Sequence, residues 1–117
     1  MMTDKRDMTE IELCCHRSER LWVTVWAEIK DGKLTVSGQD LGGTVEAWFD
    51  GSDEFEYSCS FDETNTRKLF SVLSENNSDP VKVFIERFSG LQGFRKLQDF
   101  CKAENIPYEY FSWHSFD

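Results

Sequence analysis

The residues of this chain best suited to chemistry are two neighbouring thiols and an imidazole, Cys14-Cys15-His16. A cysteine beside a histidine can act as an activated nucleophile, and the same side chains can bind zinc. Consecutive residues of a strand point to opposite faces, however, so Cys14 and Cys15 are badly placed to share one metal ion. Neither these cysteines nor Cys59 and Cys101 form a C-x-x-C pair. We therefore expect free thiols, no metal and no cofactor.

Two other segments contain residue types that serve ligand binding. The glycine-rich run from Gly38 to Gly43 resembles a phosphate-binding loop, but no Lys or Arg occurs in the 23 residues that follow it. A loop or bulge that ends a hairpin is the interpretation this run favours. Asp50, Asp53 and Glu54 could hold a cation, yet they lack the order of a calcium loop. Because no nucleophile, base and orienting group can be assembled, we predict that the chain is not an enzyme.

The distribution of charge is the most informative feature of the sequence. Between Leu34 and Thr66 there are eight carboxylates and no Lys or Arg, whereas the rest of the chain holds 14 acidic residues against 13 basic ones. Most of the net charge of −9 therefore comes from this one segment. The segment also contains aromatic residues, which distinguishes it from a solvated acidic tail. Concentrated negative charge on a folded surface attracts positively charged partners.

This pattern predicts a non-enzymatic inhibitor that binds the basic surface of a nucleic-acid-processing enzyme. Same-face residues of a strand lie about 6.8 Å apart, roughly twice the 3.4 Å rise between phosphates of one duplex strand, so a carboxylate row could mimic nucleic acid. Anti-CRISPR proteins and immunity proteins of nuclease toxins are analogous in charge and size, although no motif is shared. The alternative is a regulatory or interaction module without inhibitory role, which could be a homodimer that pairs through an exposed edge strand. The predicted partner-binding residues are Asp40, Glu46, Trp48, Phe49, Asp50, Asp53, Glu54 and Glu56.

Length and composition set the remaining expectations. The 117 residues, 39% of them hydrophobic, suit a single domain over 10–117 that follows a flexible N-terminal segment, 1–9. No apolar run is long enough to span a bilayer, and the start lacks the apolar stretch of a secretory signal. A chain this acidic should be repelled by nucleic acid and by anionic membranes. We expect a cytoplasmic protein that binds neither directly.

Alternation of apolar and polar residues predicts strands in the first half of the chain. Residues 21–30 and 33–37 flank Asp31-Gly32, a two-residue hairpin turn that pairs Lys30 with Lys33 and Trp26 with Ser37. This register places Trp22 and Trp26 on one face, which we expect another element to cover because exposed tryptophans are uncommon. Further strands are expected at 11–16 and 54–61, with 44–49 either a strand or a turn. In 11–16, residues 11, 13 and 15 should share one face.

The second half of the chain predicts helices and one last strand. Asp62 and Asp79-Pro80 are typical helix starts, Ser89 and Gln92 have capping-box spacing for a third helix, and Asn105 to Pro107 should end that helix. Residues 108–114 carry rings on both faces, which favours a central strand. The predicted fold is α+β: an antiparallel sheet of four to five strands with two to three helices packed on one face, the helices inserted before the C-terminal strand.

Overall fold

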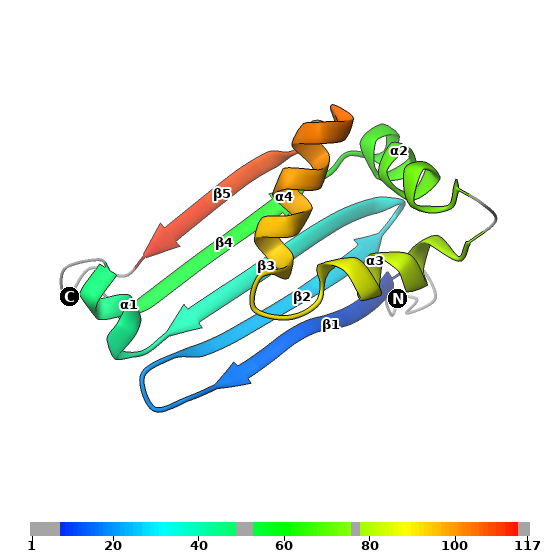
Figure 1. Ribbon diagram of the computed structural model, residues 1–117. Helices are drawn as coiled ribbons and strands as arrows, with labels where there is room; N and C mark the ends of the chain where they lie inside the picture. The colour runs from blue at the N-terminus through cyan, green and yellow to red at the C-terminus, as the bar shows by residue number, and fades with distance from the viewer. Residues whose placement is uncertain (1–7, 49–52, 76–77, 115–117) are drawn as a thin grey trace, which may run out of the picture.

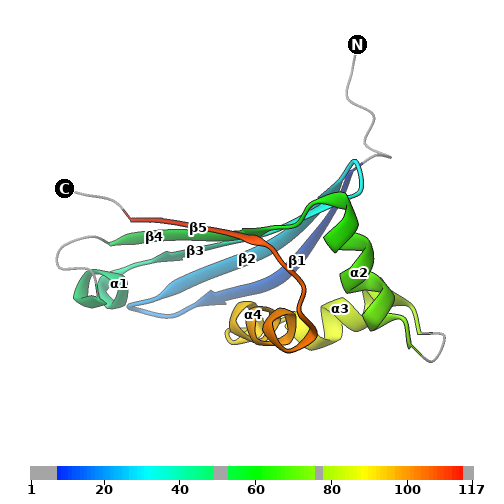
Figure 2. The same cartoon turned by 90° about the horizontal axis from the view of Figure 1, so that it is seen from above.

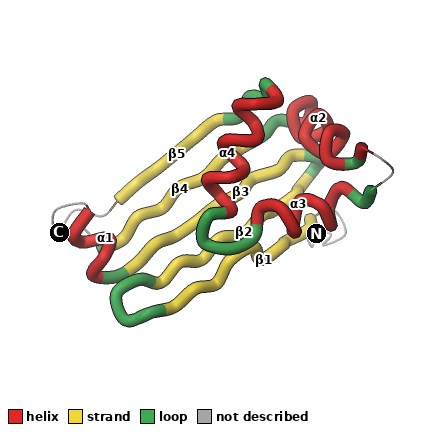
Figure 3. Tube along the Cα trace, in the orientation of Figure 1, coloured by secondary structure: helices red, strands yellow, loops and turns green. Residues whose placement is uncertain are grey.

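The computed structural model describes residues 8–48, 53–75 and 78–114, which form five strands and four helices (Figures 1 and 3). The strands form one antiparallel sheet in the order β1-β2-β3-β4-β5, and α2, α3 and α4 connect β4 to β5. The predicted α+β fold, with its helices inserted before the last strand, is confirmed. The elements are β1 (Met8–Arg17), β2 (Trp22–Lys30), β3 (Lys33–Leu41), α1 (Gly43–Trp48), β4 (Glu54–Ser60), α2 (Glu63–Leu73), α3 (Pro80–Phe88), α4 (Gly93–Glu104) and β5 (Glu109–His114).

The hairpin between β2 and β3 sets the register of the whole sheet. Asp31 and Gly32 both have positive φ, 53° and 76°, as a tight two-residue turn of this kind requires. Lys30 therefore pairs with Lys33, and Trp26 with Ser37, as the sequence predicts. Directly opposed residues of antiparallel strands point to the same face, so this register decides which side chains share a surface.

The three long helices lie on one side of the sheet, as the view from above shows (Figure 2). Leu34, Leu69, Phe84 and Leu97 are fully buried between the two layers. Phe84 contacts the rings of Phe70 and Phe88, with ring centroids 5.7 and 5.3 Å away. The core therefore lies between the helices and one face of the sheet, and the opposite face takes no part in it.

Two of the three predicted helix starts are confirmed. Asp62 accepts a hydrogen bond from the backbone of Asn65 at 2.8 Å, and Asp79 caps α3 in front of Pro80. The capping box predicted for α4 is wrong. The side chain of Gln92 makes no capping hydrogen bond, and the Ser89 hydroxyl donates instead to a carbonyl oxygen of α3.

Residues 44–49, predicted as a strand or turn, differ from both expectations. Residues 44–48 belong to helix α1, and Phe49 lies outside the described residues. Gly42 turns the chain at φ 118°, and the loop before β2 then holds the start of the helix. The backbone of Thr44 donates to the Arg20 carbonyl at 2.9 Å, and the Arg20 side chain donates to the Gly43 carbonyl at 3.0 Å. These long-range contacts could not be read from local spacing.

A bulge in β1 changes the predicted alternation of its side chains. The pairing with β2 shifts between Glu12 and Cys14, so Leu13 and Cys14 are both buried and Cys15 is exposed. The prediction that Leu13 and Cys15 share a face is wrong because the bulge inserts one extra residue. Cys14 and Cys15 do differ in exposure, as expected. The strand itself begins at Met8, two residues before the predicted domain boundary.

The last strand, β5, lies at an edge of the sheet and pairs with β4 alone among the described elements (Figure 1). The prediction that it is central is therefore wrong. Its rings face both sides because Tyr110 contacts Phe94 of α4, at 6.5 Å between centroids, whereas Phe111 and Trp113 point to the other face. β5 therefore has aromatic residues on both faces, as a central strand would, although it lies at the edge of the sheet.

Candidate protein-binding face

The face of the sheet turned away from α2, α3 and α4 is not covered by any described element (Figure 2). We call it the open face. Its members follow from the strand register, because each is paired across the sheet with the next. The open face consists of Met8, Glu10, Glu12, Cys15 and Arg17 of β1, Trp22, Thr24, Trp26, Glu28 and Lys30 of β2, Lys33, Thr35, Ser37, Gln39 and Leu41 of β3, Glu54, Glu56, Ser58 and Ser60 of β4, and Glu109, Phe111 and Trp113 of β5.

Four large rings are exposed on the open face. Trp22 and Trp26 are 41% and 37% exposed, and Phe111 and Trp113 are 60% and 43% exposed. The expectation that an element covers Trp22 and Trp26 is wrong. The helices pack on the face that carries the aliphatic residues of β2 and β3, and one helical layer can cover only one side of a sheet. Exposed aromatic residues gathered on one surface are typical of interaction sites.

The rings stand on either side of a polar strip. Trp26 of β2 is linked through Ser37 of β3 and Ser58 of β4 to Phe111 of β5, in one row across the sheet. Three strand spacings of about 4.8 Å separate the two rings of that row, roughly 14 Å in all. In this row small hydroxyl side chains form the floor between two aromatic margins, and in a neighbouring row Gln39 and Glu56 lie between Thr24 and Trp113. A segment of a partner can lie along such a floor and contact rings on both sides.

Negative charge dominates the open face. It carries three basic residues, of which Lys30 and Lys33 lie at the hairpin end and Arg17 stacks on the Trp22 ring at 4.6 Å. Against them stand six glutamates from four strands, namely Glu10, Glu12, Glu28, Glu54, Glu56 and Glu109. One of these glutamates has a shifted pKa. Partial burial, together with the hydrogen bond and charge of Glu54, raises the pKa of Glu56.

The side chain of Gln39 links the two glutamates of β4. Its amide nitrogen Nε2 donates to Glu54 at 2.7 Å and to Glu56 at 3.5 Å. One amide therefore serves two carboxylates of the same strand, which holds them side by side on the surface. This arrangement keeps both carboxylates pointing outward at the spacing that the strand dictates.

Only part of the predicted site lies on this face. Glu54 and Glu56 do, whereas Asp40 points to the opposite face and Asp53 lies exposed just before β4. Glu46 and Trp48 belong to α1, and their side chains, like all of Phe49 and Asp50, lie outside the described residues. Sequence reasoning missed the glutamates of β1, β2 and β5 and all four exposed rings as members of the site. The hairpin register was the available signal, because it already placed Trp22 and Trp26 away from the aliphatic face.

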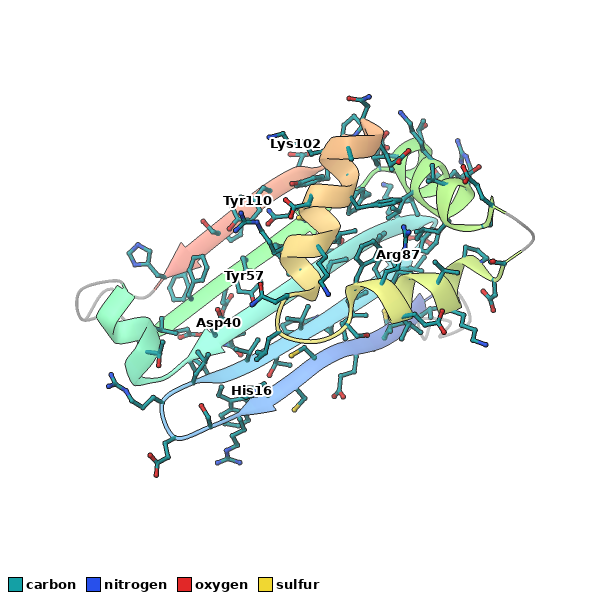
Figure 4. All side chains as sticks on the ribbon, viewed as in Figure 1. His16, Asp40, Tyr57, Arg87, Lys102 and Tyr110 are labelled. Carbon is teal, nitrogen blue, oxygen red and sulfur yellow. The ribbon has the colours of Figure 1, made fainter. Side chains whose placement is uncertain are left out.

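Asp40 belongs to a half-buried polar pair on the helix side of the sheet. The Tyr57 hydroxyl donates to its carboxylate at 2.8 Å (Figure 4). The Tyr57 ring lies over Gly38 and against Phe94 of α4, with 4.7 Å between ring centroids. Gly38 is therefore part of β3 and not of a loop, which corrects the prediction for residues 38–43. Burial raises the pKa of Asp40, although the hydrogen bond from Tyr57 opposes that shift.

The raised pKa of Asp40 predicts a pH dependence of stability. An acid whose pKa is higher in the folded chain is destabilising once ionised, so its contribution is lost as pH rises from its unfolded pKa through its folded pKa. Asp40→Asn should therefore increase the unfolding free energy at pH 7 and flatten its fall as pH rises above about 4, the pKa of an unfolded aspartate. Urea unfolding at several pH values would measure this. Asp53→Asn, at an exposed carboxylate, controls for the loss of one charge; equal gains in both variants would contradict the assignment.

Three of the four cysteines, Cys14, Cys59 and Cys101, are buried free thiols, and Cys15 is exposed. Burial raises the pKa of Cys59 to about 12 and that of Cys101 to about 11, which keeps both as thiols at neutral pH. Burial also raises the pKa of Cys14, with the neighbouring Cys15 adding to the shift. Among the described residues, no three His, Cys, Asp or Glu side chains gather as a metal site would require.

Comparisons with known proteins add no relationship to this picture: no protein-family model, curated protein or solved structure matches the chain. Within residues 8–48, 53–75 and 78–114, no helix is long and apolar enough to cross a membrane.

Proposed function

We propose that this protein is a non-enzymatic inhibitor that binds, through the open face, a basic surface of a nucleic-acid-processing enzyme. The observation that carries the proposal is the combination of exposed rings with six glutamates on one uncovered sheet face. Rings supply the desolvated contacts that hold a complex, and carboxylates steer it onto positive charge. Enzymes that bind nucleic acid present such a positive surface to phosphates.

The sheet layer and the helix layer differ in charge, and this difference orients the protein in the proposed complex with its target. The three long helices carry seven basic residues against four acidic ones, the reverse of the balance on the open face. The exposed acids Asp62, Glu75 and Asp79, which cap or follow these helices, bring that layer close to neutral. A basic partner is therefore attracted more strongly to the sheet side than to the helix side. Glu54 and Glu56 also support mimicry of nucleic acid, since their spacing of about 6.8 Å is roughly the rise of one duplex strand over two nucleotides.

The test begins with capture of the target from host lysate on the immobilised full chain, followed by elution with salt and identification by mass. Binding and inhibition of the purified target are then measured for a variant with Glu54, Glu56 and Glu109 changed to lysine. We expect association at least about tenfold slower than for the natural chain at low salt, with inhibition reduced in parallel. Rising salt should narrow the difference in association rate between the variant and the natural chain.

A matched control changes the same amount of charge on the other layer. Glu86, Asp99 and Glu104 lie on α3 and α4 and are exposed. Replacing these three by lysine should leave association unchanged or slow it much less than the open-face variant does. Equal losses in the two triple variants would attribute the effect to net charge alone and remove the open face as the binding site. Thermal unfolding of both variants confirms that each is folded.

A further inference from the structure

The edge strand β5 has features that are rare at a free sheet edge. Of its six residues only Glu109 is formally charged at pH 7, and Tyr110, Phe111 and Trp113 are 50%, 60% and 43% exposed. Its pairing with β4 runs without a register shift from Glu109 to His114. A regular, apolar edge strand presents backbone N–H and C=O groups that readily pair with another strand.

The opposite edge of the same sheet is protected in the usual ways. β1 contains the bulge after Glu12, which interrupts its pairing pattern, and it carries Glu10, Glu12 and Arg17. Bulges and charges at edges prevent association between sheets. Because β1 has these features and β5 does not, the two edges differ in their suitability for pairing. The rings on both faces of β5 are those of a strand that has a neighbour on each side.

We propose that β5 pairs antiparallel with β5 of a second copy of this chain, around a two-fold axis at Ser112, so that two five-stranded sheets become one. This inference does not rest on the proposed inhibitor function, because it concerns the sheet edge and not the open face. In the dimer β5 becomes a central strand. The open faces of the two copies then lie side by side and form one surface of twice the width, which presents two binding sites to a partner.

The register follows from which side chains must share a face. An axis perpendicular to the sheet keeps both open faces on one side, so residues opposite each other must both point to it or both away from it. Centring on Ser112 pairs Phe111 with Trp113 of the second copy twice, and Ser112 with itself. Aromatic cross-strand pairs of this kind stabilise sheets. Centring on Phe111 would instead place Glu109 against Trp113, next to the interface. With the axis at Ser112, β5 is therefore complementary to β5 of the second copy.

The oligomeric state of the full chain tests this pairing directly. Sedimentation over a concentration series should show a monomer–dimer equilibrium. Ser112→Lys places two like charges beside the axis and should weaken the dimer at least about tenfold. Ser71→Lys, at an exposed position of α2, should leave it unchanged. A monomer at every concentration, or a dimer that Ser112→Lys does not weaken, would overturn the proposal.

A cross-linking variant tests the register and does not depend on the lysine variant folding. In a Cys15→Ser background, which removes the exposed native thiol, Ser112→Cys should give a covalent dimer when treated with oxidised glutathione, because two residues directly opposite can meet disulfide geometry. Ser58→Cys, in the interior strand β4, should stay monomeric. A folded Ser112→Cys chain that does not cross-link would refute the axis at Ser112. Ser112 points away from the open face, so target binding can be measured separately in each variant.

Discussion

Replacing Trp22 and Trp26 together by threonine should weaken binding of the captured target by roughly a hundredfold or more, while the domain stays folded. Buried tryptophans are frequent hot spots of interfaces, and each can contribute about 2 kcal/mol or more to binding. Both rings lie on the open face and contribute little to the core. Threonine keeps the preference for strand structure, so the unfolding free energy should fall by no more than about 1–2 kcal/mol.

The measurement is a titration of the target, read by tryptophan emission and by inhibition. Trp22, Trp26 and Trp113 are all exposed on the open face, so burial by a partner should shift emission of the natural chain to shorter wavelength. Phe84→Ala serves as a control that lowers stability and leaves the binding face intact. That ring is fully buried, and its removal should cost about 3–5 kcal/mol of stability without touching the binding face. Undiminished binding by the folded tryptophan double variant would exclude the open face as the interface.

Local patterns in the sequence were sufficient to predict most of the fold. The Asp31-Gly32 turn needs positive φ at both positions, so it fixes the pairing of β2 with β3 without reference to the rest of the molecule. Asp62 and Asp79 act within one helical turn, which makes their capping equally local. Alternation and helical spacing then gave strands followed by helices, and hence the α+β class.

Apart from the capping box at Ser89 and Gln92, which is a local error, the main errors concern features that depend on distant contacts. The bulge in β1 exists because of its pairing with β2, and α1 is held by Arg20 from a different loop. Whether β5 is central depends on what lies beside it, and alternation alone cannot reveal a missing neighbour. In the same way, the register showed that Trp22 and Trp26 share a face, but not whether a helix would cover that face.

In the candidate site too, local sequence patterns identified some of the residues, and the others depend on how distant strands pair. Acidic residues that are close in sequence are separated in space, because alternate residues of β3 and β4 point to opposite faces: Glu54 and Glu56 are on the open face and Asp40 is not. Glu28 and Glu109 reach the open face from other strands. A run of charge in the sequence therefore pointed to strands of this sheet, but it identified only Glu54 and Glu56 among the acidic residues of the open face.

Gly38→Ala should destabilise the domain by about 2–4 kcal/mol, although alanine is ordinarily the better residue in a strand. A Cβ at Gly38 would lie 2.1 Å from the ring of Tyr57, which must then move. Tyr57 cannot move freely, because it packs against Phe94 and Phe55 and donates to Asp40. Overpacking of a core costs about 1–3 kcal/mol, and a disrupted hydrogen bond to a half-buried carboxylate adds to that cost.

A double-mutant cycle separates this steric cause from a general intolerance of alanine at Gly38. The unfolding free energy is measured for Gly38→Ala, Tyr57→Ala and the two together, by urea unfolding at pH 7. Without the Tyr57 ring the new methyl group has room, so Gly38→Ala should then cost little or become stabilising. An equal cost in both backgrounds would show that the ring is not the obstacle. The Tyr57 hydroxyl opposes the rise in the pKa of Asp40, so displacing the ring should also raise that pKa further, which makes the instability of Gly38→Ala smaller in acid than at neutral pH.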